Sequence, residues 1–165
     1  MTWWPWKKPM PSPADVAREL RERALNYTAS ELDIVPTGDL PNVFGILMET
    51  AYPEAVASLV TFVEGTTSLY FSSGGGIIGA GEHDSVRATL APFFRTAEEH
   101  ISSFATANAT PLPAPGRVRF YLRTHRGTLT AEADEQDLGE MRHPLSPLFH
   151  AGHKVITAVR EATPN

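Results

Sequence analysis

Apolar residues recur at helical spacing in three stretches of the chain, and each stretch begins with a residue that can cap a helix. Ser12 precedes a proline at the first start, and the pattern predicts a helix that ends near Ser30. Asp84 begins the second predicted helix, in which Pro92 either kinks the helix or starts a second segment. Ser146, again followed by a proline, begins the third predicted helix.

Between the first two predicted helices the pattern changes to runs rich in β-forming residues. Residues 43–52 and 56–62 flank a Pro-Glu turn, and residues 68–72 follow a second turn at Gly65. Links this short leave no room for parallel crossovers. The strands are therefore expected to form an antiparallel meander.

A second hairpin is predicted between the last two helices. If Arg126-Gly127 is its turn, Phe120 faces the core, and Arg119 lies opposite Asp134 on a solvent-exposed face. The expected fold class is α+β, with a five-stranded, mainly antiparallel sheet packed with helices in the order α-β-β-β-α-β-β-α.

Length and composition favour one folded domain. The chain has 165 residues, of which 42% are hydrophobic and 20% charged, and this is sufficient for a packed core. We expect an N-terminal arm at residues 1–11 and a single α+β domain at residues 12–165. The sequence shows neither a secretory signal nor a long apolar run, so the expected location is cytoplasmic, without membrane contact.

Charge and residue types narrow the chemistry further. A net charge of −5 argues against nucleic acid as a partner. The absence of cysteine excludes disulfides, thiolate nucleophiles and cysteine-bound metals. His143, His150 and His153 cluster near the last helix, but no acid accompanies them at ligand spacing, so no metal site is expected. The sequence predicts no cofactor and no catalytic residue, and it favours a protein without enzymatic activity.

Arginines follow the first strand of the second hairpin and its turn, at positions 117, 119, 123 and 126. They could form a basic binding surface for an acidic partner or an anion. The acidic residues expected on the opposite strand favour the alternative that the arginines form cross-strand pairs on an exposed face.

The most conspicuous segment runs from Gly74 to Gly81. Its glycines are Gly74, Gly75, Gly76, Gly79 and Gly81. They formally match the dinucleotide-binding pattern, but that turn needs a parallel βαβ unit, which the predicted meander does not supply. Two alternatives remain: backbone N–H groups that bind a small anionic ligand, or a bent strand end where backbones come close, including across a dimer interface.

All three tryptophans, Trp3, Trp4 and Trp6, lie in the arm of residues 1–11, hereafter the Trp arm. Indoles are enriched where surfaces meet, so something should cover them. The leading hypothesis is a non-catalytic module that binds another protein or forms a homodimer through the Trp arm. The alternative is a small anionic ligand-binding or enzyme domain that uses the segment Gly74–Gly81.

Overall fold

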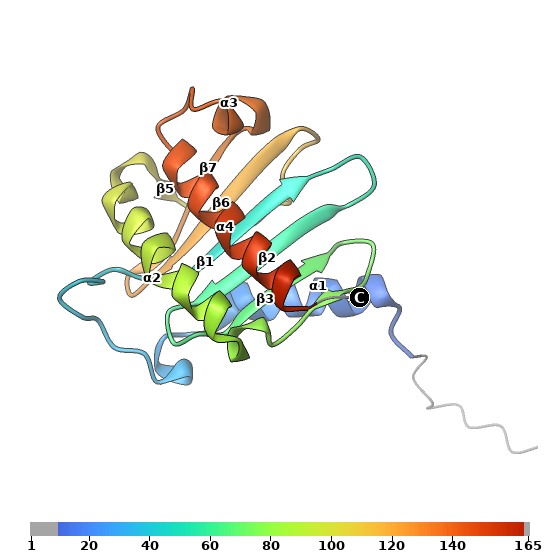
Figure 1. The fold of residues 1–165 in the computed structure, drawn as a ribbon, viewed down its shortest axis with the longest axis horizontal. Coiled ribbons are helices and arrows are strands. Elements are labelled where there is room, and N and C mark those ends of the chain that lie inside the picture. Colours follow the sequence, from blue (N-terminus) through green and yellow to red (C-terminus); the bar gives the residue numbers. More distant parts are fainter. Residues whose placement is uncertain (1–9, 164–165) are drawn as a thin grey trace, which may run out of the picture.

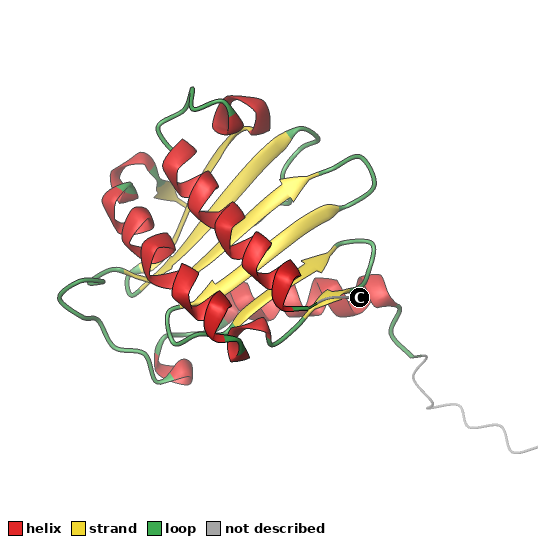
Figure 2. Ribbon diagram, in the orientation of Figure 1, coloured by secondary structure: helices red, strands yellow, loops and turns green. Residues whose placement is uncertain are grey.

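The computed structural model describes residues 10–163 and shows an α+β fold built on a single antiparallel sheet (Figures 1 and 2). The strands are β1 (Val43–Ala51), β2 (Val56–Phe62), β3 (Thr67–Phe71), β4 (Gly76–Ile77), β5 (Ala105–Thr106), β6 (Arg117–Thr124) and β7 (Gly127–Asp134). The helices are α1 (Pro13–Asn26), α2 (Asp84–Glu99), α3 (Glu135–Gly139) and α4 (Ser146–Ala162). Short 3₁₀ turns occupy Ser30–Leu32, Ala80–Glu82 and Ile101–Ser103.

The α+β class and the antiparallel sheet are confirmed, but the expected strand number and element order are wrong. The sheet has seven strands in the order β4-β3-β2-β1-β6-β7-β5. The missed strands β4 and β5 have two residues each, too few for a period-two pattern, and each forms only by pairing with an edge of the sheet. The missed helix α3 has five residues and is equally short of a pattern.

Helices α2 and α4 cover one face of the sheet (Figure 1). Their apolar stripes pack on inward side chains of the central strands, among them Ile46, Leu59 and Phe120, which have no solvent exposure. Helix α2 runs through Pro92 without ending, so this proline lies inside a single helix. No helix within residues 10–163 is long and apolar enough to cross a membrane.

Helix α1 crosses the opposite face (Figure 1). Its start is as predicted, with Ser12 and Asp15 in a reciprocal capping box. The helix ends at Asn26, and its buried residues are Ala17, Ala24 and Leu25, whereas Val16 remains 40% exposed. The helix thus turns a narrow, small-residue face to the sheet.

The second hairpin has a different register from the predicted one. Its turn pairs Thr124 with Gly127, which places Arg119 opposite Glu132. The register differs by two residues from the expectation, so each side chain keeps its face and Phe120 is buried as predicted. The opposite face is also covered, contrary to expectation, and Tyr121 has no solvent exposure because α1 packs over it.

Candidate functional site

A row of polar side chains crosses the α1 face of the sheet. Strand register places Tyr70 beside Ser58, Ser58 beside Glu49, Glu49 beside Arg119, and Arg119 beside Glu132. This row, hereafter the polar row, therefore spans β3, β2, β1, β6 and β7 in turn. Such a row is unusual beneath a helix, because buried polar groups must be paired to avoid the cost of desolvation.

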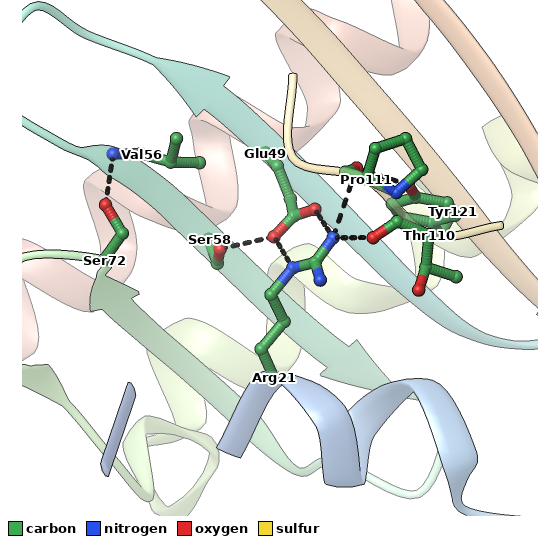
Figure 3. Close-up of polar contacts among 8 residues, drawn as sticks. All are labelled: Arg21, Glu49, Val56, Ser58, Ser72, Thr110, Pro111 and Tyr121. Carbon is green, nitrogen blue, oxygen red and sulfur yellow. Dashed lines mark hydrogen bonds and ion pairs between the residues drawn. The ribbon is translucent and has the colours of Figure 1, made fainter. Parts of the chain in front are cut away.

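Glu49 is at the centre of the polar row and has no solvent exposure. Helix α1 supplies Arg21, whose Nε and Nη2 donate to the two carboxylate oxygens at 2.8 and 2.9 Å (Figure 3). The Ser58 hydroxyl donates to the same carboxylate at 2.6 Å. Burial lowers the pKa of Arg21, but the hydrogen bonds and charge of Glu49 outweigh this and raise it above its ordinary value. The pair is therefore a charged, bidentate ion pair.

A proline-rich segment, residues 110–115, forms a second wall beside α1. Arg21 Nη2 also donates to the carbonyl oxygens of Thr110 and Pro111, at 2.9 and 3.3 Å. The Tyr121 hydroxyl donates to the Pro111 carbonyl at 2.6 Å. These contacts from β6 and α1 hold the segment over the sheet, and Leu112 follows with 44% of its surface exposed.

Between α1 and the sheet lies a cavity of about 310 Å³. Its lining residues are Ala14, Ala17, Arg18, Arg21, Glu22, Ser58, Tyr70, Ser72 and Leu112. Tyr70 is only 5% exposed, and its hydroxyl is buried without a hydrogen-bond partner among the described residues. Burial, reinforced by the nearby negative charge of Glu49, raises the pKa of Tyr70, so the hydroxyl stays protonated at neutral pH.

This arrangement is suited to binding rather than to acid–base catalysis. The Ser58 hydroxyl donates a hydrogen bond to a carboxylate that Arg21 already neutralises, which makes Glu49 a poor general base. Within residues 10–163 no three His, Asp or Glu side chains are grouped to hold a metal ion. The groups available to a ligand are the neutral hydroxyl donor of Tyr70, the remaining guanidinium nitrogen of Arg21, and an apolar wall.

The glycine segment is split between two places. Gly74 lies against Pro13 at the start of α1, and Gly76 pairs with Tyr70 in the β4–β3 ladder. Gly81 is packed against the Gly65 backbone on another side. The Gly74 N–H donates to the Phe71 carbonyl, so it does not take part in an anion cradle. Backbones therefore come close at Gly74, Gly76 and Gly81, whereas Gly75 and Gly79 have open space around them. Anion binding by this segment stays a prediction.

Several other sequence candidates are placed apart from the cavity. His150 and His153 flank the ring of Phe149 on α4, with ring centroids 5.5 and 4.4 Å away. Arg119 pairs with Glu132 at 2.7 Å, as the cross-strand alternative requires. Arg123 is 8% exposed and donates to carbonyls at the end of α1, so it anchors a helix instead of facing solvent. Trp3, Trp4 and Trp6 lie outside the described residues.

Sequence reasoning missed the Arg21–Glu49 pair, Ser58 and Tyr70. One signal was available: Glu49 is the only charged residue in the run Val43–Ala51, whose every residue is buried. A lone acid in such a run requires a partner, but only the folded structure identifies it as Arg21. No protein-family model, curated protein or solved structure matches the chain.

Proposed function

We propose that this protein binds a small, mainly apolar molecule through an oxygen acceptor, in the cavity between α1 and the sheet. The observation that carries the proposal is the hydroxyl of Tyr70, a buried donor without a partner beside that cavity. A buried unsatisfied hydroxyl costs about 1–3 kcal/mol. A ligand oxygen that accepts from Tyr70 removes this cost.

The lining defines the ligand class. Ala14, Ala17 and Leu112 contribute apolar surface, while Arg21 and Arg18 contribute guanidinium groups. The volume of about 310 Å³ lies at the lower end of small-molecule sites, which span about 300–1,000 Å³. A monocarboxylate or a carbonyl compound with a short apolar body fits these features, because its oxygen can accept from a tyrosine and a guanidinium together.

Ligand-dependent thermal shifts and calorimetry test this proposal. The probes are benzoate and hexanoate, with the matching alcohols, benzyl alcohol and hexanol, as weaker acceptors. At one hundred times its dissociation constant, a ligand is expected to add about 2.7 kcal/mol to the free energy of unfolding. The carboxylates should stabilise the protein more than the alcohols do.

Tyr70→Phe removes the hydroxyl and keeps the ring. We expect the free variant to be at least as stable as the original protein, because an unsatisfied buried group is lost, and to bind the carboxylates about fivefold more weakly. Tyr52→Phe, at a residue 40% exposed and outside the cavity lining, is the matched control and should bind normally. No thermal shift with any probe, or equal affinity in Tyr70→Phe, would overturn the proposal.

A further inference from the structure

A second hollow of about 250 Å³ lies along the N-terminal half of α1, next to the short edge strand β4. Its lining includes Val16, Leu20, Tyr70, Gly75, Gly76 and Ile78. We call it the α1–β4 groove. Two of its apolar side chains remain open to solvent, since Val16 is 40% exposed and Ile78 is 66% exposed. The groove is thus an apolar surface with room above it.

Glycine keeps this groove open. A Cβ atom built on Gly75 would meet no atom within 4 Å, so the space above this backbone is empty. Backbone without side chains offers a flat surface for an aromatic ring. Exposed apolar patches that adjoin a hollow of this kind mark interaction sites in soluble proteins.

We propose that the α1–β4 groove receives tryptophan side chains from the Trp arm of a second copy of this chain. The Trp arm ends at the groove itself: Met10, 92% exposed, and Pro11 lead directly into Pro13, which lines the groove at the first turn of α1. The arm carries every indole of the chain. An indole has a large apolar area and would fill the open space between the apolar walls of the groove.

Proline spacing makes the partner copy the donor of the arm. Proline occupies positions 9, 11 and 13, so residues 8, 10 and 12 each precede a proline and are disfavoured in the helical conformation. Ser12 is indeed extended, with φ −66° and ψ 158°. A stretch of five residues with this restriction spans about 16 Å at 3.1 Å per residue. This restriction disfavours the reversal of chain direction that would bring Trp6 back onto the groove of its own chain.

Exchange of arms between two copies fills both grooves at once. A two-fold axis pairs each arm with the groove of the other copy, which gives a closed dimer. Because prolines reduce the conformations of the free arm, little entropy is lost when it docks. The groove and the cavity of the proposed ligand are lined in part by different residues, so the two inferences can fail separately.

Sedimentation and tryptophan fluorescence of the full chain test the proposal together. We expect a dimer whose emission is blue-shifted, and a red shift upon dilution to the monomer, because all the tryptophans are in the arm. Ile78→Asp, at an exposed groove position, should give a folded monomer with red-shifted emission. Val35→Asp, at a residue 73% exposed and outside the groove, is the matched control and should remain dimeric.

Complementation gives the sharper result. A variant that lacks residues 1–10 has a groove but no tryptophan, whereas Ile78→Asp has the arm but a damaged groove. When mixed, they should form a heterodimer through one arm, and the emission should shift to the blue. A monomeric full chain, a dimer that survives Ile78→Asp, blue-shifted emission in the monomer, or no shift on mixing would each overturn the proposal.

Discussion

Glu49 shows how one buried charge depends on a single partner. Its carboxylate has no solvent exposure, and the Arg21 side chain that neutralises it is 14% exposed. Loss of one member of a buried ion pair is far more damaging than loss of both, because the remaining charge stays desolvated. Arg21→Met is therefore expected to lower the free energy of unfolding by about 3–5 kcal/mol, measured by urea denaturation.

The double variant Arg21→Met/Glu49→Met is the control for this prediction. It removes both charges and should recover most of the stability lost in Arg21→Met, since apolar side chains then fill the site. A double variant no more stable than Arg21→Met would show that the pair contributes through packing and not through charge compensation.

His153 predicts how stability depends on pH. Burial, together with the charges of His150 and Arg160, lowers the pKa of His153 below its ordinary value of 6.5. The unfolded chain therefore binds this proton at a higher pH than the native state does. Stability should be highest above about pH 6.5 and fall as the pH decreases from there through the native pKa.

The measurement is the urea midpoint between pH 8 and pH 5 for the original chain and for His153→Met. We expect the variant to lose a smaller share of its stability on acidification, because its side chain cannot take up a proton. Identical pH profiles would contradict the assignment to His153, and the values at pH 8 separate any packing effect of methionine from the titration.

At the scale of elements, the turn between β3 and β4 depends on two glycines for different reasons. Gly75 has φ +83° but open space around its Cβ position, whereas Gly76 has φ +149° and its Cβ would overlap the Leu69 carbonyl. Gly75→Val should cost about 1–2 kcal/mol for the backbone conformation alone. Gly76→Val should cost more, because it also separates β4 from β3, and thermal unfolding would rank the two. Equal melting temperatures would contradict this.

Long elements could be predicted from the sequence because each carries a complete pattern. The spans of β1, β2 and α2 follow from their apolar runs. The predicted cap at Asp84 is wrong: Asp84 is the first helical residue, and His83 occupies the N-cap position without a side-chain hydrogen bond. Elements created by pairing with a neighbour, such as β4, could not be predicted. The observed register of the second hairpin differs from the predicted one because His125-Arg126, and not Arg126-Gly127, forms the turn. Charge pairing alone does not distinguish registers two residues apart.

The cavity could not be predicted for a related reason. Its residues come from α1, β2, β3, the turn after β3 and the segment at 110–115. These meet only because α1 folds over a face that alternation alone assigned to solvent. Arg21 lies on the surface of a helix, where arginine is common, and its partner Glu49 is 28 residues away along the chain. Spacing along one chain carries no information about such a pair.

In the whole molecule, helical layers cover both faces of one sheet, and the two layers differ in how much apolar surface they bury. Helix α4 buries large side chains such as Leu148, Phe149 and Val155, while α1 buries two alanines and one leucine. Polar contacts hold α1 in place: the Arg21–Glu49 pair, and Arg123, which donates to the Ala24 and Tyr27 carbonyls at 2.6 and 2.7 Å. The α1 layer is therefore expected to open without unfolding of the sheet.

Native-state hydrogen exchange measures this opening. Amides of α1 should exchange at a lower free energy than those of β1 and β6, with a weaker dependence on denaturant, because opening α1 exposes less apolar surface than unfolding of the whole sheet does. Arg123→Met removes charge-assisted bonds at the C-terminal end of α1 and should accelerate exchange in α1 more than in β1. Arg126→Met, in the hairpin turn, is the matched control and should leave α1 unchanged. If α1 and β1 exchanged at the same free energy in all three proteins, the sheet and both its layers would unfold as one unit, and a ligand could not reach the cavity by displacement of α1.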